Sequence, residues 1–598
     1  MPNPLFNDRD VEFALYEILH ADELCRLAFF SDHTRETFDL FLQSSRKFAR
    51  DVLFPAYKPM DDAPPKLEAG RVHVHPLMKE IYPRLVELGM LSATRSHEVG
   101  GQQLPLTIAS AAGAYLAAAN LSAAGYLMLT TGAARLIESF GNDWQKEHFM
   151  ARMYGGSWTG TMALTEPQAG SSLTDVKTRA TPLEDGSYSI RGSKVFISGG
   201  DQDMTENIVH LTLARIEGAP PGIKGVSLFA IPKFRVEGER FVDNDCTTAG
   251  VFHKIGYRGL PSIALNFGEN GQCRGYLVGE PNRGIRCMFQ LMNEARVGVG
   301  MQGVATAAVA YQEALEYAKV RPQGRRFEQR DPAQPQIPII EHADVRRMLL
   351  RQKAIVEGGF LLLLATARYF DLAEHSEEPA ERRRANLLLE LLTPVAKSFP
   401  AEKGFESNVL AIQVHGGYGY TSEYMPEAWM RDQKLNSIHE GTSGIQSMDL
   451  LGRKVVAEGG EALRLLIEQV ASSASSARAA GVDPAWCDAV ERAGSLIAGL
   501  TAELGARGLA GDVAAMLLHS FDYLDLFATW VIAWQWLVQA GAAKRGLAEG
   551  RAADQAFYRG KLHAAQYWIR TELPRIEHLA RLCSEGEDSY ATIAADCF

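Results

Sequence analysis

Residues 413–446 read QVHGGYGYTSEYMPEAWMRDQKLNSIHEGTSGIQ, a stretch that combines paired glycines with a carboxylate and a hydroxyl. Its two adjacent glycines allow the backbone to approach another group closely, because glycine has no Cβ. Further along, the run HEGTSG places the carboxylate of Glu440 and the hydroxyl of Thr442 on either side of Gly441, just ahead of a predicted helix. Taken alone, Glu440 would most often be a solvated residue that caps this helix.

Two earlier segments have a composition that suits ligand binding. Residues 162–172, MALTEPQAGSS, form a loop with hydroxyls and backbone N–H groups that could face an anionic or polar ligand, although a turn with capping residues is the simpler interpretation. In residues 194–200, KVFISGG, side chains alternate along a predicted strand, so Phe196 and Ser198 share one face. An aromatic ring beside a hydroxyl could cover a flat ligand, or Phe196 could belong to the core.

The periodicity of apolar residues changes twice along the chain. Helical spacing from residue 8 to about 154 gives way to segments rich in β-branched and aromatic residues, at 187–198, 208–214 and 226–231. Helical spacing returns near Asn282 and continues to the end. We therefore predict an N-terminal helical domain, a β domain, a helical bundle with the catalytic base and an additional C-terminal helical domain, spanning residues 1–155, 156–285, 286–455 and 456–598.

Gly298, Gly300 and Gly303 satisfy the pattern GxGxxG of dinucleotide-binding folds. That fingerprint requires a strand before it and an acidic residue about 20 positions after it. Here the flanking sequences have helical spacing on both sides. We predict that these glycines allow close packing of helices instead.

Composition excludes several other classes of protein. The net charge of −11 comes without a Lys/Arg stripe, which argues against a nucleic-acid partner. The seven cysteines include no CxxC pair, so no metal site is predicted and a reducing cytoplasm is expected. The most apolar stretch, 526–538, is shorter than the roughly 20 residues of a membrane span, so we expect a buried helix and no integral membrane segment.

In combination, these motifs resemble those of the acyl-CoA dehydrogenase family. ALTEPQAGS is similar to the family's first signature, VFISGG to its flavin-covering strand, and QVHGGYGY through HEGTSGIQ to its second signature and catalytic segment. They occur in family order from about residue 35 to 455. The resemblance implies an α+β fold of the acyl-CoA dehydrogenase type, and the extra C-terminal region is similar to that of a longer bacterial branch.

The resemblance also implies a bound FAD and the residues that hold it. Thr165 resembles the residue that contacts the flavin ring, Phe196 the one that covers the ring, and Ser198 the hydroxyl at flavin N5. Residues of the third domain would hold the phosphates and the adenine half across the interface of a homodimer. The complete set of predicted cofactor-binding residues is Thr165, Gly170, Ser171, Phe196, Ser198, Arg321, Gln323, Gln413, Gly416, Gly417, Thr442 and Gln446.

Glu440 matches the family's catalytic base. Some members take the base from the position before the arginine that Arg296 resembles, but this chain has Ala295 there, with Glu294 as the fallback. For acyl-CoA binding the resemblance points to Arg296, Asn293 and His439.

Three positions depart from the family pattern. Ser172 and Asn293 replace aspartates that are common in the family, and His439 replaces a tyrosine.

The implied reaction is FAD-dependent dehydrogenation of an acyl-CoA to trans-2-enoyl-CoA in fatty acid β-oxidation, with electrons passed to an electron-transfer flavoprotein. An acyl-CoA oxidase that reduces oxygen shares the same fold, cofactor and base. A non-catalytic scaffold on this fold is a third possibility. The acyl group stays open among straight, branched, thioether and cyclic chains.

Overall fold

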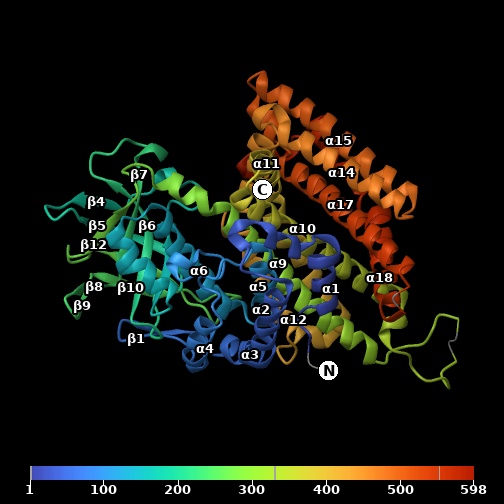
Figure 1. Ribbon diagram of the computed structural model, residues 1–598, viewed down its shortest axis with the longest axis horizontal. Helices are drawn as coiled ribbons and strands as arrows, with labels where there is room; N and C mark the ends of the chain where they lie inside the picture. Colours follow the sequence, from blue (N-terminus) through green and yellow to red (C-terminus); the bar gives the residue numbers. More distant parts are fainter. Residues whose placement is uncertain (1–2, 329–330, 551) are drawn as a thin grey trace. The chain divides into compact units, whose positions relative to one another are not determined.

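The computed structural model describes residues 3–328, 331–550 and 552–598, with the side chains of 290–292 and 552 left out of the description. Contacts between residues divide the chain into two compact units. Unit 1 comprises the described parts of 1–35, 106–111 and 296–598, and unit 2 comprises 36–105 and 112–295. Figure 1 shows the helices and strands of both units.

The helices of unit 2 precede its large sheet in the chain. They are α2 (Arg35–Phe48), α3 (Phe54–Asp62), α4 (Pro76–Glu87), most of α5 (Leu106–Ala119) and α6 (Leu121–Phe140). Asn120 separates α5 from α6, because its backbone is extended and its side chain accepts a hydrogen bond from the N–H of Ala123. A short hairpin of β1 (Lys66–Glu68) and β2 (Arg71–His73) connects α3 to α4.

An eight-stranded sheet forms the rest of unit 2, with strand order β10-β11-β5-β12-β7-β6-β3, and with β4 paired to β5 and β6. Neighbours are antiparallel except where β6 pairs with β3 and β4. The strands are β3 (Trp158–Ala163), β4 (Arg179–Pro182), β5 (Tyr188–Ser198), β6 (Asn207–Ile216), β7 (Val226–Pro232), β10 (Cys246–Val251), β11 (Ser262–Phe267) and β12 (Arg274–Val278). A separate hairpin joins β8 (Phe234–Glu237) to β9 (Arg240–Asp243).

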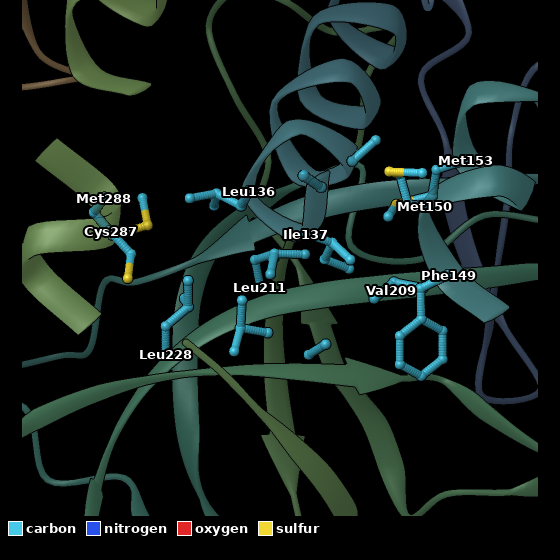
Figure 2. Close-up of a cluster of buried hydrophobic side chains, with 14 of the residues drawn as sticks. Leu136, Ile137, Phe149, Met150, Met153, Val209, Leu211, Leu228, Cys287 and Met288 are labelled. Carbon is cyan, nitrogen blue, oxygen red and sulfur yellow. The ribbon is translucent and has the colours of Figure 1, made fainter. Parts of the chain in front are cut away.

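Apolar side chains of α6 pack on this sheet and form one core of unit 2. Figure 2 shows Leu136 and Ile137 of α6 facing Leu211 and Leu228 of the strands. The beginning of α9 adds Cys287 to the same buried cluster. Burying apolar surface is the main favourable contribution to folding, so this cluster fixes α6 to the sheet.

Long helices form the first part of unit 1. They are α9 (Gly284–Val320), which begins in unit 2, α10 (Ala343–His375) and α11 (Pro379–His415), followed by the short α12 (Pro426–Gln433) and α13 (Ser443–Asp449). A Cβ added at Gly300 would lie 2.1 Å from the carbonyl oxygen of Ala396, and one at Gly303 would lie 3.0 Å from Pro400. These glycines therefore bring α9 against α11, which confirms the predicted close helix packing.

The C-terminal helices of unit 1 are α14 (Glu461–Ala479), α15 (Pro484–Leu509), α17 (Ser520–Ala548), α18 (Gln555–Tyr567) and α19 (Arg575–Glu585). Helix α17 contacts α14, α15, α18 and α19. Its residues Trp530, Trp534 and Trp536 are buried, so the prediction of a buried helix at 526–538 is confirmed. Within the described ranges, no helix combines the length and the apolar character that crossing a membrane requires.

Candidate active site

The loop 162–172 of unit 2 follows β3 and is organised around Glu166. A tight turn joins Glu166 to Ala169 through two backbone hydrogen bonds of 2.9 and 3.0 Å. The Glu166 carboxylate accepts hydrogen bonds from the N–H groups of Lys177 and Thr178, at 2.7 and 3.0 Å, and from the Thr178 hydroxyl at 2.6 Å. The loop is thus held by a buried carboxylate rather than by its exposed serines.

Lys194 of β5 is the ionic partner of Glu166. Its Nζ lies 2.8 Å from Glu166 Oε1 and donates to the carbonyls of Leu164 and Leu213, and both ionic side chains are almost fully buried. Burial by itself would raise the pKa of Glu166, but the pairing with Lys194 and the hydrogen bonds hold it at about 2. Burial lowers the pKa of Lys194 to about 8, so both groups are charged at neutral pH.

A β-bulge in β5 exposes Phe196. Lys194 pairs with Leu265 and Ile197 with Ile263, so two residues of β5 oppose one residue of β11. Phe196 has a φ of 60° in this bulge and is 63% exposed.

The bulge places the predicted flavin-binding residues of β5 next to the loop. The N–H of Val195 donates to the carbonyl of Thr165 at 2.9 Å. The ring of Phe196 lies 4.6 Å from that of Phe252 between centroids, with an interplanar angle of 31°. Ser198 is half-buried, and Gly170 and Ser171 are exposed. An exposed aromatic surface beside hydroxyls and backbone N–H groups fits a flat, phosphate-bearing cofactor such as FAD.

In unit 1, the predicted base occupies a strained turn ahead of α13. Glu440 has a φ of 52° and Gly441 a φ of 82°, so two consecutive residues are left-handed. The side-chain amide of Gln446 donates to the carbonyl of Glu440 at 3.1 Å, and Lys397 of α11 donates to the carbonyl of Gly441 at 2.7 Å. The hydroxyl of Thr442 caps α13 by accepting the N–H of Ile445 at 3.2 Å.

Glu440 is exposed to solvent by its accessible surface, yet protein atoms lie densely around its carboxylate, and this crowding sets the direction of its pKa shift. This desolvation raises the pKa of Glu440, and the positive charges of Lys397 and Arg296 oppose the rise. Desolvation also lowers the pKa of His439 to about 3, so its ring is neutral at physiological pH. His439 Nε2 lies 3.3 Å from the side-chain oxygen of Asn436.

Arg296 is buried, and its guanidinium lies 2.8 Å from the carboxylate of Asp449. The structure thus engages this predicted CoA-binding residue in an ion pair near the base. In unit 2, Asn293 is half-buried, and Glu294, the alternative base, pairs with Arg135 of α6. A carboxylate that is paired with a guanidinium is a weaker base than a carboxylate whose pKa is raised by desolvation.

The remaining predicted cofactor residues lie on two adjoining segments of unit 1. The guanidinium of Arg321 lies 5.3 Å from the ring centroid of Tyr418. Gln323 is exposed, and its backbone N–H donates to the carbonyl of Ile337 at 2.9 Å. The exposed residues of the second segment are Gln413, Gly416 and Gly417, which stand at and just beyond the end of α11.

The structure therefore brings the predicted residues together in three groups: the flavin-loop residues in unit 2, and the base segment and the Arg321 segment in unit 1. Sequence reasoning missed Glu166, Lys194, Lys397 and Asp449. For Lys397 a signal was present, since it is a single cation in the run PVAKSFPA of α11. For the pair of Glu166 and Lys194, no local sequence pattern indicates that the two residues meet.

Four family descriptions match successive parts of the chain. Residues 35–157 match the N-terminal domain of acyl-CoA dehydrogenases, 161–269 the middle domain and 282–455 the C-terminal domain. Residues 466–594 match a family described as acetyl-CoA dehydrogenase C-terminal like.

Relatives of known activity match over nearly the full length. The chain is 38% identical to 3-methylmercaptopropionyl-CoA dehydrogenase of Ruegeria pomeroyi, over 94% of this chain and 95% of that protein. It is 34% identical to a butyryl-CoA dehydrogenase of Syntrophomonas wolfei, over 96% of each. The structure of an acyl-CoA dehydrogenase complexed with FAD from Bacillus anthracis shares the fold, with a TM-score of 0.73 and 19% identity over 96% of this chain and 91% of that one.

These matches confirm the predicted fold class, with its helical, β and helical parts and its added C-terminal helices, and the predicted FAD cofactor. The chain belongs to the acyl-CoA dehydrogenase family of FAD-dependent enzymes.

Proposed function

We propose that this enzyme converts a short acyl-CoA to its trans-2-enoyl-CoA, with Glu440 as the base that removes the α-proton. The observation that carries the proposal is the environment of Glu440: desolvation raises its pKa, and a strained, hydrogen-bonded turn holds it. A carboxylate with a raised pKa is a stronger base, which an α-proton of a thioester requires. The rival Glu294 is held in an ion pair with Arg135.

Other groups of the base segment would assist this proton transfer. An enolate that forms at the thioester needs a donor for its oxygen, and the backbone N–H of Glu440 is the donor that the family resemblance indicates. His439 is neutral because burial keeps its pKa at about 3, so it would shape the acyl pocket without adding charge.

Bound FAD would accept the β-hydride. Thr165, Phe196 and Ser198 of unit 2 would hold its ring, and the exposed loop at Gly170 and Ser171 its pyrophosphate. Arg321, Gln323, Gln413, Gly416, Gly417, Thr442 and Gln446 of unit 1 are proposed for the adenine half, with contributions across a homodimer.

The acyl group is proposed from the named relatives. A 3-methylmercaptopropionyl chain and a butyryl chain are similar in length, and both relatives match nearly the full chain. We propose a short straight or thioether acyl-CoA, with Arg296, Asn293 and His439 near the substrate. A panel of acyl-CoAs ranked by the rate of flavin bleaching tests this assignment.

The electron acceptor is proposed to be an electron-transfer flavoprotein, as in fatty acid β-oxidation. Comparing hydrogen peroxide yield with reduction of an acceptor dye distinguishes this dehydrogenase from an oxidase. A cytoplasmic location is also proposed, and it is supported by the seven cysteines, all of which are free thiols.

Glu440→Gln tests the central proposal. The variant keeps the size of the side chain but cannot accept the proton, so we expect it to retain FAD and to lose flavin reduction by roughly 10²- to 10⁴-fold. Stopped-flow bleaching of the yellow enzyme by acyl-CoA measures this rate. Glu294→Gln is the matched variant and should bleach at nearly the wild-type rate. Rapid bleaching by Glu440→Gln would exclude Glu440 as the base.

A further inference from the structure

Lys397 is a buried cation that the reaction described above does not use. It lies in α11, with none of its surface exposed, and its Nζ donates to the carbonyl of Gly441 at 2.7 Å. Burying an ammonium group is costly unless it is hydrogen-bonded or paired, so a lysine in this position requires an explanation. The group it contacts is the peptide between Gly441 and Thr442, whose carbonyl belongs to the residue that follows Glu440.

That peptide belongs to a strained turn. Left-handed backbone is unfavourable for a residue with a side chain, and it persists only where the surroundings hold it. Here two side chains donate to successive carbonyls: Gln446 Nε2 donates to the carbonyl of Glu440, and Lys397 Nζ donates to the carbonyl of Gly441. A Cβ added at Gly441 would lie 2.6 Å from the Gln446 amide, so the turn is also closely packed.

Two cations act on the Glu440 carboxylate from different elements. Arg296 of α9 and Lys397 of α11 both lower the pKa of Glu440 against the effect of desolvation. Lys454, beyond α13, interacts with Arg296 and pairs with Glu390.

The anions and neutral groups near the base differ in how far they neutralise these two cations. The carboxylate of Asp449 forms an ion pair with the guanidinium of Arg296 at 2.8 Å and also pairs with Arg453. Glu402 of α11 accepts the hydroxyl of Ser443 and acts electrostatically on Lys397. The adjacent His439 is neutral. Arg296 is thus directly neutralised by a carboxylate, whereas Lys397 donates to a neutral carbonyl.

We propose that Lys397 is a positioning residue for the dehydrogenation: its ammonium holds the Gly441 carbonyl, fixes the left-handed turn that aims the Glu440 carboxylate, and supplies a positive charge beside it. This inference rests on the proposed role of Glu440 as the base. The hydrogen bond and the charge have separable consequences. Loss of the hydrogen bond lets the turn relax and lowers the rate of proton removal, and loss of the charge makes Glu440 harder to ionise.

The test uses the FAD-loaded enzyme and the acyl-CoA of the panel that bleaches it fastest. Single-turnover flavin reduction is measured at saturating substrate across pH 5 to 9. In Lys397→Met we expect the rate to fall roughly 10- to 100-fold. The acid limb of the profile should move upward by about one pH unit, because the positive charge is gone. Lys397→Gln keeps a neutral donor, so part of the rate should return while the limb stays displaced.

Two further variants separate the hydrogen bond from the charge. Gln446→Met removes the other donor and keeps Lys397, so the rate per bound flavin should fall without movement of the acid limb. The rate is taken per bound flavin because Gln446 is also proposed for the adenine half of FAD. Lys403→Met is the matched control, because Lys403 also lies in α11 but pairs with Glu406 and Asp525. It should change neither quantity. Flavin content and Tm identify any variant that does not fold.

The outcomes are distinguishable from failure of the proposed function. Suppose that a Lys397 variant retains flavin and shows the wild-type rate and acid limb, while Glu440→Gln is inactive. This result would overturn the role of Lys397 and leave the role of Glu440 as the base intact. Rapid bleaching by Glu440→Gln would overturn the role of Glu440 itself. A displaced limb and a slow rate in the Lys397 variants, with Lys403→Met unchanged, support the proposal.

Discussion

Removing the carboxylate of Glu166 would leave the ammonium of Lys194 buried without its counter-charge. The two groups are 2.8 Å apart and almost fully buried. Breaking such a pair from one side costs about 3 kcal/mol or more, because an uncompensated charge remains in the interior. We therefore expect Glu166→Gln to lower the Tm of the protein and its flavin content, measured by thermal unfolding and absorbance. Glu184→Gln, on an exposed turn, should change neither.

The same pair predicts a pH dependence of stability. The pKa of Glu166 in the folded protein is about 2, below the ordinary value of 4.5. Its contribution to stability is therefore complete above pH 4.5 and is lost as the pH falls toward 2. The difference in Tm between the wild type and Glu166→Gln should shrink across this window. A difference that stays constant from pH 6 to pH 3 would contradict the assigned pair.

At the scale of elements, the contact between α9 and α11 leaves no room for a side chain at Gly300. An ideal Cβ there would lie 2.1 Å from the carbonyl oxygen of Ala396, next to Lys397 on α11. Because that atom belongs to the backbone, Gly300→Ala must separate the helices, and we expect the free energy of unfolding to fall by about 3 kcal/mol, the upper end of the usual range for overpacked interiors. Chemical unfolding measures the loss.

Gly499→Ala is the matched control for Gly300→Ala. Gly499 lies inside α15, and a Cβ there would meet nothing within 4 Å. Alanine is favoured over glycine in a helix by about 1 kcal/mol, so this variant should be as stable as the wild type or slightly more so. Equal stability of the two alanine variants would show that α9 and α11 are not in close contact.

The extent to which the sequence predicts these elements depends on the range of the interactions. Periodicity locates β5, β6 and β7 to within about two residues of the observed strands, because alternation along a strand is a local property. The bulge at Phe196 leaves no such trace, since it depends on the pairing with β11.

The site shows the same division. The family motifs predict Glu440 as the base, but the donors that hold its turn come from Lys397, 43 residues earlier, and from Gln446, for which a different role was predicted. Contacts between distant residues depend on the tertiary fold, which local spacing does not specify.

At the scale of the whole chain, the N-terminal segment contacts helix α18 and the turn before it within unit 1. Arg9, next to Asp10 in α1 (Asp8–Glu12), pairs with Asp554 and donates to the hydroxyl of Tyr558 at 3.0 Å. Lys561 of α18 lies 2.7 Å from both Asp10 and Glu357 of α10. The N-terminal segment is thus bound to the added C-terminal helices by a buried network of charges, which helical periodicity alone does not predict.

Lys561→Met tests whether this network holds the N-terminal segment against the C-terminal helices. The variant leaves the buried carboxylate of Asp10 without the ammonium of Lys561, which lowers its pKa. We therefore expect the packing of the N-terminal segment to be destabilised by about 3 to 5 kcal/mol, so that this segment detaches more readily. Glu357 retains Lys353, and the detachment should therefore begin at α1. Hydrogen exchange of residues 3–30 and limited proteolysis measure it. Lys544→Met, at a half-buried site in α17, serves as the control.

The double variant Asp10→Asn, Lys561→Met should recover part of the lost stability, because neither partner then carries a buried charge. Equal protection of residues 3–30 from hydrogen exchange in all variants would contradict the role of the network.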